Sequence, residues 1–124
     1  MDCDVNKYLN YGYSILLSCI NREVKSFGYL TELGVHHIGN ENPFNLSCDL
    51  IEPLRPYVDR MVLRNDINDD NFKKVFIEML NNRVNFNGNN MYLENAIHLY
   101  VQSVFLALKD NNASKIVFVD YELL

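Results

Sequence analysis

The sequence lacks the features that would point to a disulfide-bonded or membrane protein. It has three cysteines, Cys3, Cys19 and Cys48, which form neither a CxxC pair nor the spacing of a zinc finger. We therefore expect neither a disulfide framework nor a structural zinc site. No hydrophobic run approaches the roughly 20 residues of a membrane-spanning helix, and the N-terminal segment lacks the basic and then apolar layout of a secretory signal. The expected location is the cytoplasm.

Positive charge is also scarce. The chain has 11 Lys and Arg against 16 Asp and Glu, which gives a formal net charge of −5. Because nucleic-acid binding normally uses a clustered basic surface, this balance argues against a stand-alone nucleic-acid-binding protein. With 124 residues the chain is long enough for one domain whose core needs no disulfide or metal.

Hydrophobic residues spaced three and four apart predict two helices in the first half of the chain, with a loop over residues 29–45 between them. One helix is expected over about residues 4–27, ended by Gly28. A second helix, capped by Asn45 or Ser47, is expected to run to about residue 65.

The second half is predicted to contain two more helices. They are expected over about residues 72–82, capped by Asp70 or Asn71, and from a cap at Asn90 to about residue 109. Between them, "RVNFNGNNMYL" carries the Asn-Gly signal of a small hairpin, and the tail "SKIVFVDYELL" reads as a short strand or an extended arm. The predicted fold class is therefore all-α, a helical bundle-like domain with about four main helices.

Two prolines near the start of the second predicted helix are unusual. In a helix interior, Pro53 and Pro56 each remove a backbone hydrogen bond and cost roughly 3 kcal/mol. The backbone is therefore expected to bend where Asp49 and Glu52 stand, with Glu52 pointing away from the hydrophobic stripe of the helix. Such a cost is easier to understand at a functional site.

A histidine and these acids form the candidate metal site. His37 lies 15 residues before Glu52, in a loop bracketed by Gly34 and Gly39. If the loop folds back, the imidazole and the carboxylate come within metal-bridging reach, about 5 Å or less, and such ligands suit Mg²⁺ or Mn²⁺. Asp49, three residues before Glu52, is a further candidate ligand or a group that orients bound water.

Other readings of the same residues stay open at this point. The acids can simply belong to a solvated helix face on which Arg55 pairs with Glu52 and Asp59. The chain can be a non-catalytic helical protein-interaction module, in which the aromatic residues build an interface. Cys48 and His37 can also form a nucleophile pair, as in a small hydrolase.

Three segments carry a resemblance to a known family. They are "LNYGYSIL" at 9–16, "LGVHH" at 33–37 and "FNLSCDLIEPLRPYVDRMV" at 44–62. In order and spacing they resemble the C-terminal catalytic lobe of the CRISPR-associated endonuclease and integrase family, Cas one (Cas1), in its type II form. The resemblance extends over essentially the whole chain.

The resemblance implies a metal-dependent enzyme of bacterial antiviral defence that inserts new spacers into a CRISPR array. It implies Mg²⁺ or Mn²⁺ held by His37 and Glu52, with Asp49 as an auxiliary catalytic acid. Tyr11 is a candidate DNA contact, and Arg55 is either a phosphate contact or a salt-bridge partner. The implied partners are prespacer and CRISPR-repeat DNA, a second copy in a homodimer, Cas two (Cas2) and other CRISPR adaptation proteins.

The chain also departs from the family pattern. Family members are more than twice this long and carry an N-terminal β domain and a first metal-binding Glu, neither of which precedes Tyr11 here. Residues 1–124 are therefore expected to be the C-terminal helical domain of such an integrase. As it stands, the chain is expected to fold but neither to cut nor to join DNA.

Overall fold

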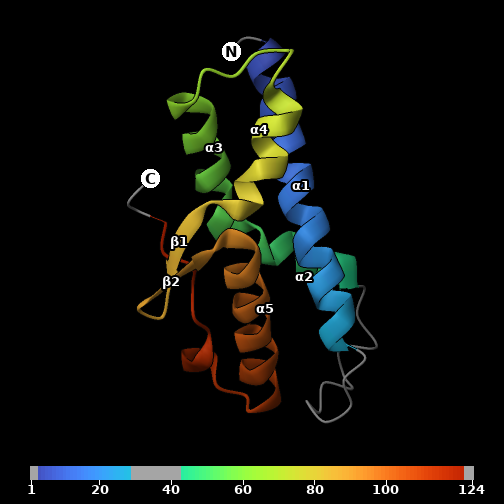
Figure 1. Ribbon diagram of the computed structural model, residues 1–124. Coiled ribbons are helices and arrows are strands. Elements are labelled where there is room, and N and C mark those ends of the chain that lie inside the picture. The colour runs from blue at the N-terminus through green and yellow to red at the C-terminus, as the bar shows by residue number, and fades with distance from the viewer. Residues whose placement is uncertain (1–2, 29–42, 122–124) are drawn as a thin grey trace.

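The computed structural model describes residues 3–28 and 43–121 and is mainly helical, as predicted (Figure 1). The helices and strands, in chain order, are α1 (Cys3–Gly28), α2 (Pro43–Leu50), η3 (Glu52–Leu54), α3 (Arg55–Arg64), α4 (Phe72–Glu78), η4 (Met79–Asn81), β1 (Arg83–Phe86), β2 (Asn89–Tyr92), α5 (Leu93–Lys109) and η5 (Ala113–Lys115). None of the described helices is long and apolar enough to cross a membrane.

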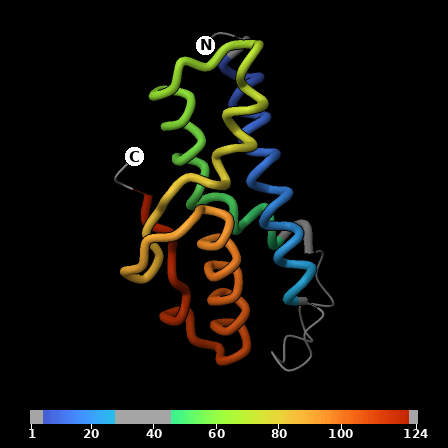
Figure 2. The backbone as a smooth tube through the Cα atoms, viewed as in Figure 1, coloured from blue at the N-terminus to red at the C-terminus, as the bar shows by residue number. Residues whose placement is uncertain are grey.

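The long helix α1 organises the domain. It packs against α2, α3, α4 and α5, with α3 and α4 beside its N-terminal part and α5 beside its C-terminal part (Figures 1 and 2). One hydrophobic core joins these helices, and its largest fully buried side chains include Leu16, Ile20, Leu54, Tyr57, Phe76 and Phe105. Burying one such side chain stabilises a domain by roughly 1.5–3 kcal/mol, so this shared core holds the helices together.

A glycine marks the place where α1 crosses two other helices. A Cβ atom at Gly12 would lie 2.6 Å from Val58 Cγ1 of α3 and 2.7 Å from Phe76 Cε1 of α4. Both neighbouring side chains are fully buried. The glycine therefore allows a closer approach of these helices than any other residue would.

The second predicted helix is divided into two. Helix α2 ends at Leu50, a single turn of 3₁₀ helix follows at Glu52–Leu54, and α3 begins at Arg55. Pro53 and Pro56 cannot donate the backbone hydrogen bonds of a continuous helix, which explains the interruption and confirms the expected bend. Because α2 begins at Pro43, neither Asn45 nor Ser47 is its cap; Ser47 is buried and donates to Asn21 Oδ1 at 3.2 Å.

The predicted hairpin is present. Strands β1 and β2 pair antiparallel, with Phe86 opposite Asn89, and the two residues between them both have positive φ, 52° at Asn87 and 85° at Gly88. These values are typical of the type I′ turn that an Asn-Gly pair favours. Asn90 lies in β2 and pairs with Asn85 of β1, so the prediction that it caps the last helix was wrong. Tyr92 holds the N-cap position of α5.

The N-cap residue of α4 is Asn71, one of the two predicted from the sequence, but its side chain does not bond to the helix. Asn71 occupies the N-cap position without a side-chain cap bond. Its Oδ1 instead accepts from the backbone N–H of Asn68, whose own Oδ1 accepts from the N–H groups of Asp70 and Asn71. The "NDINDDN" turn is therefore closed by its own side chains.

The C-terminal segment is an extended arm that runs beside α5 to the hairpin, one of the two predicted alternatives. Val117 N–H donates to Ser103 Oγ of α5 at 3.0 Å. Farther along, Asp120 and Asn85 of β1 exchange two backbone hydrogen bonds of 2.8 and 2.9 Å. The arm, residues 116–121, is thus tied both to α5 and to the hairpin.

Candidate functional site

Glu52 is the first residue of the 3₁₀ turn between α2 and α3, and its side chain is 63% exposed. Arg55 Nε donates to Glu52 Oε1 at 3.0 Å, so the predicted ion pair between these residues is present. Exposed pairs of this kind contribute about 0–1 kcal/mol, so the arginine can be displaced at little cost. The carboxylate is accessible to a ligand from solvent.

Asp49 is also exposed, on the last turn of α2. Helix α2 ends at Leu50 and η3 begins at Glu52, so the two acids belong to different helical elements. Within the described ranges, no group of three His, Cys, Asp or Glu side chains is arranged to hold a metal ion. The described part of the predicted site therefore supplies carboxylate oxygens, which are the ligands that Mg²⁺ and Mn²⁺ prefer.

His37 lies outside the described residues. Its distance from Glu52, and its pairing with Cys48, therefore stay predictions. Cys48 is half-buried in α2, whereas Cys19 is buried in α1. Burial raises the pKa of the Cys19 thiol to about 11, which keeps it protonated and unreactive near neutral pH. Both are free thiols.

Arg55 also contacts α1. Its guanidinium carbon lies 4.9 Å from the centre of the Tyr13 ring, within reach of a cation–π interaction. Tyr13 OH in turn donates to Asp59 Oδ1 at 2.5 Å. Partial burial and the hydrogen bond to Asp59 raise the pKa of Tyr13 to about 12, so the hydroxyl stays a donor.

The expected pairing of Arg55 with Asp59 was wrong. Of the ion pairs among the described residues, Arg55 takes part only in the one with Glu52. Asp59 accepts from Tyr13 instead. Glu52, Arg55, Tyr13 and Asp59 thus form one chain of contacts that joins the 3₁₀ turn to α1 and α3.

Tyr11, the tyrosine predicted from the sequence as a DNA contact, packs against α4 and not beside Arg55. The ring of Tyr11 packs edge-on against Phe72, with 5.2 Å between ring centres, and also contacts Phe76 on α4. Its role as a DNA contact stays a prediction. Tyr13, which sequence reasoning passed over, is the tyrosine beside Arg55; the available signal was its place in the same "NYGY" motif.

A comparison with protein families decides the relationship. The model of the family described as CRISPR associated protein Cas1 matches residues 3–94. The chain belongs to the Cas1 family. The matched range runs from α1 to the start of α5 and includes every predicted site residue: Tyr11, His37, Asp49, Glu52 and Arg55.

Individual Cas1 relatives match different shares of the chain. The chain is 46% identical over 59 residues to the CRISPR-associated endonuclease Cas1 of Neisseria meningitidis serogroup C (strain 8013). The aligned residues cover 48% of this chain and 19% of that protein. It is 26% identical over 132 residues to the CRISPR-associated endonuclease Cas1 of Korarchaeum cryptofilum (strain OPF8), covering 94% of this chain and 39% of that protein. The chain thus spans well under half the length of these Cas1 relatives.

Proposed function

We propose that residues 1–124 form the C-terminal helical domain of a Cas1 integrase, a metal-dependent DNA endonuclease that inserts new spacers into a CRISPR array. The observation that carries the proposal is the match to the Cas1 family over residues 3–94. Within that range, two prolines interrupt a helix and leave Glu52 exposed on the turn between its halves. A costly break beside an accessible carboxylate supports a functional role for that carboxylate.

In this proposal Glu52 and His37 are metal ligands, and Asp49 is an auxiliary acid. The exposed carboxylates of Glu52 and Asp49 fit a hard cation such as Mg²⁺ or Mn²⁺. Such an ion, when bound, polarises a phosphoryl oxygen and stabilises the charge that develops on it. Arg55 steadies the Glu52 side chain, and because this exposed pair is weak, the guanidinium can turn to a DNA phosphate when substrate arrives.

The proposed reaction is a transesterification. A DNA 3′-hydroxyl attacks the phosphorus of a phosphodiester at the repeat boundary, one P–O bond forms, and the bond to the leaving oxygen breaks. The proton of the attacking hydroxyl is lost, and the leaving oxygen gains one. The proposed setting is the bacterial cytoplasm, with prespacer and repeat DNA, a homodimer, Cas2 and other adaptation proteins as partners.

The metal-ligand role can be tested on this chain with Mn²⁺ alone. Mn²⁺ broadens the amide NMR signals of nearby residues even when binding is weak, so a titration reports both the place and the strength of binding. We expect broadening centred on residues 49–55 that is lost in Glu52→Gln and in His37→Ala. Glu78→Gln, the same change at an exposed glutamate of α4, is the matched control and should behave as wild type.

A second measurement tests the activity. In a full-length protein that contains this domain, Glu52→Ala and His37→Ala are expected to abolish spacer integration while leaving the fold intact, because Glu52 is exposed. Near-normal integration of purified DNA by either variant, with Cas2 present, would show that its proposed ligand role is wrong.

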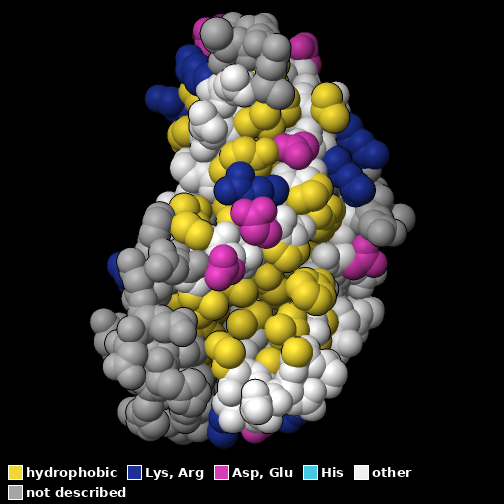
Figure 3. Space-filling model, turned by 180° about the vertical axis from the view of Figure 1, so that it is seen from behind, with side chains coloured by type: hydrophobic (Ala, Val, Ile, Leu, Met, Phe, Trp, Pro, Cys, Tyr) yellow, Lys and Arg dark blue, Asp and Glu magenta, His cyan; other side chains and the backbone are white. Residues whose placement is uncertain are grey.

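A helical protein-interaction module is the second candidate function, and one observation favours it. Leu63 of α3 is 83% exposed and lies with Val5, Leu9 and Val62 at a hollow of about 320 Å³ between α1 and α3. Hydrophobic side chains also cover much of the face opposite to the view of Figure 1 (Figure 3). The Mn²⁺ titration separates the two candidates, because an interaction module has no reason to bind the metal at Glu52.

A further inference from the structure

We propose that two tyrosine hydroxyls, those of Tyr100 and Tyr121, fix the backbone of the turn that presents Glu52 and thereby set its affinity for a divalent cation. The inference rests on the proposed role of Glu52 as a metal ligand. The two tyrosines are positioning residues, since they bond the backbone beside Glu52. They lie in α5 and in the C-terminal arm, both beyond the range that the Cas1 family model matches.

The turn needs outside donors because of its prolines. In a 3₁₀ turn each carbonyl accepts from the N–H three residues later, and in an α-helix from the N–H four residues later. For the Leu50 carbonyl, the residue three later is Pro53, which has no N–H, and the residue four later is Leu54, whose N–H donates to Ile51 O at 2.8 Å. Both regular donors to the Leu50 carbonyl are therefore lost.

Tyr100 takes their place. Its hydroxyl donates to the Leu50 carbonyl oxygen at 2.9 Å, across 50 residues of sequence. Both residues are buried, with 2% and 7% of their surface exposed. Burial raises the pKa of Tyr100 to about 12, so the hydroxyl keeps its proton at any physiological pH. A buried carbonyl left without this donor would cost about 1–3 kcal/mol, so the bond holds the turn from its N-terminal side.

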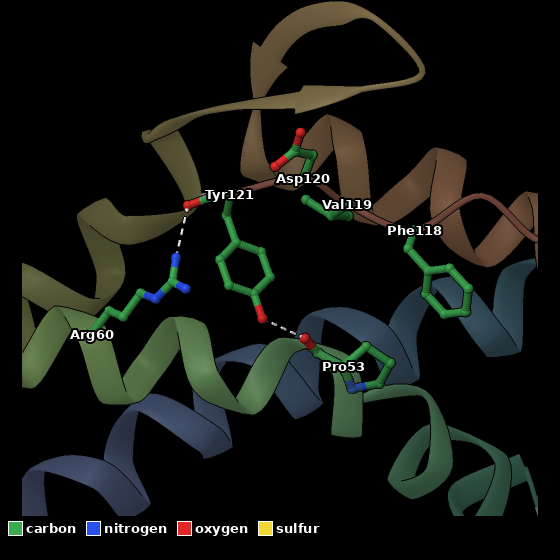
Figure 4. A pocket seen from close by; sticks show the side chains of 6 residues that line it. All are labelled: Pro53, Arg60, Phe118, Val119, Asp120 and Tyr121. Carbon is green, nitrogen blue, oxygen red and sulfur yellow. Dashed lines mark hydrogen bonds between the residues drawn. The ribbon is translucent and has the colours of Figure 1, made fainter. Parts of the chain in front are cut away.

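Tyr121 does the same on the other side of Glu52. Pro56, three residues after Pro53, has no N–H to continue the 3₁₀ turn, and Tyr121 OH donates to the Pro53 carbonyl oxygen at 2.6 Å. Figure 4 shows this hydroxyl pointing from the arm towards Pro53, across a pocket of about 340 Å³. The turn is therefore bonded at both flanks, to α5 and to the arm.

The Tyr121 ring is itself held in place. It packs edge-on against the Tyr57 ring, with 5.3 Å between ring centres, and the Arg60 guanidinium lies 5.3 Å from its centre. Arg60 also donates to the Tyr121 carbonyl oxygen at 3.4 Å, as Figure 4 shows. The preceding residue, Asp120, is paired with Asn85. The arm thus brings the hydroxyl to the turn from a fixed direction.

A metal ligand must be held to within about 0.5 Å of its working position, so a looser turn should bind a cation less well. Losing an outer partner of a metal ligand typically costs 10–100-fold in metal affinity. Because each tyrosine holds only one flank, we expect Tyr100→Phe and Tyr121→Phe each to weaken Mn²⁺ binding about tenfold, at the lower end of that range. The double variant should lose more.

The test uses the whole 124-residue chain, Mn²⁺ as the probe, and conditions in which circular dichroism shows each variant to be folded. Mn²⁺ affinity is read from NMR line broadening, and amide hydrogen exchange is followed at residues 51–55. Two tyrosines supply matched controls. Tyr92→Phe removes an exposed hydroxyl on β2, and Tyr8→Phe removes the hydroxyl of a buried tyrosine of α1 that donates to Asp69 Oδ1 at 2.9 Å. Both control variants should keep wild-type affinity.

The outcomes separate this inference from the proposed function. Mn²⁺ binding that depends on Glu52 but is unchanged in Tyr100→Phe and Tyr121→Phe overturns the inference alone, even if exchange at the turn becomes faster. An equal loss of affinity in Tyr8→Phe also overturns it, because general destabilisation would then explain the effect. Absence of Mn²⁺ binding by the wild-type chain, or equal binding by Glu52→Gln, overturns the ligand role and the inference with it.

Discussion

Tyr11 and Tyr13 stand two positions apart on α1 and meet different helices. Two helical positions are separated by about 200° around the axis. Tyr11 therefore faces Phe72 and Phe76 of α4, whereas Tyr13 faces Arg55 and Asp59 of α3. Of the two, the hydroxyl of Tyr13 has the charged partner, so it is the one whose removal should matter for stability.

Tyr13→Phe is expected to lower the free energy of unfolding by about 1 kcal/mol, because it removes the hydrogen bond to Asp59 at a partly buried position. Urea unfolding followed by circular dichroism measures the change. Tyr11→Phe is the matched control on the same helix and should fall within about 0.5 kcal/mol of wild type. Equal stability of the two variants would show that the Tyr13–Asp59 bond contributes nothing.

At the scale of the elements, the sequence predicted the features that depend only on residues close together in the chain. The spacing of apolar residues along 4–27 predicted α1, and the Asn-Gly pair predicted the hairpin turn. Pro53 and Pro56 predicted the bend beside Glu52. Each of these signals acts within a few residues, so no knowledge of the packing was needed.

The features that the sequence did not predict depend on distant partners. Asn90 looked like a cap, but pairing with Asn85 in the hairpin placed it in a strand. The two tyrosine bonds to the 3₁₀ turn join residues that are 50 and 68 positions apart in the sequence. No local sequence pattern indicates such bonds. For the same reason Tyr13 was missed at the candidate site, while Glu52 and Arg55, only three residues apart, were correctly paired.

The crossing of α1 with α3 and α4 allows a prediction about Gly12. Gly12→Ala should destabilise the domain by about 1–3 kcal/mol, because its methyl group would come within 3 Å of the Val58 and Phe76 side chains. This is the reverse of the roughly 1 kcal/mol gain that alanine brings at an open helix position. Thermal unfolding of Gly12→Ala measures the effect, beside Ser18→Ala at an exposed position of α1. A Gly12→Ala variant as stable as wild type would mean that the helices can move apart at no cost.

At the scale of the whole molecule, buried thiol and phenol groups make the fold sensitive to alkali. The pKa of Cys19 rises from 9.0 to about 11 on folding, and those of Tyr13 and Tyr100 rise from 10.0 to about 12. The unfolded chain therefore releases these protons at lower pH than the folded chain does. Since the unfolded state then binds fewer protons, the free energy of unfolding falls as pH increases from about 9 to 12.

We expect the free energy of unfolding to be about 2–4 kcal/mol lower at pH 10.5 than at pH 8, measured by urea unfolding. Below about pH 8 these groups should cause no change, because both states keep their protons. A Cys19→Ala variant should show a smaller loss between the two values. Equal stability of the wild-type chain at pH 8 and pH 10.5 would contradict the prediction.

The chain by itself is expected neither to cut nor to join DNA. Its net charge of −5 disfavours contact with DNA phosphates. Branched and 3′-ended duplex DNA would be incubated with the chain and Mn²⁺ at low salt, beside the full-length Neisseria relative as a positive control. Comparable cleavage or strand transfer by the 124-residue chain would show either that the first metal-binding Glu of the family is dispensable or that the site is assigned to the wrong residues.

The bond between Tyr121 and Pro53 also bears on the order in which the domain is completed during translation. During translation, residues 51–54 are synthesised well before residue 121, since 68 positions separate Pro53 from Tyr121. Helix α1 can meet α2 and α3 while synthesis continues, but the turn must wait for the last segment of the described chain. The Glu52 carboxylate therefore reaches its final position late. A polypeptide that ends before Tyr121 would form the helices but lack the bond that completes the turn.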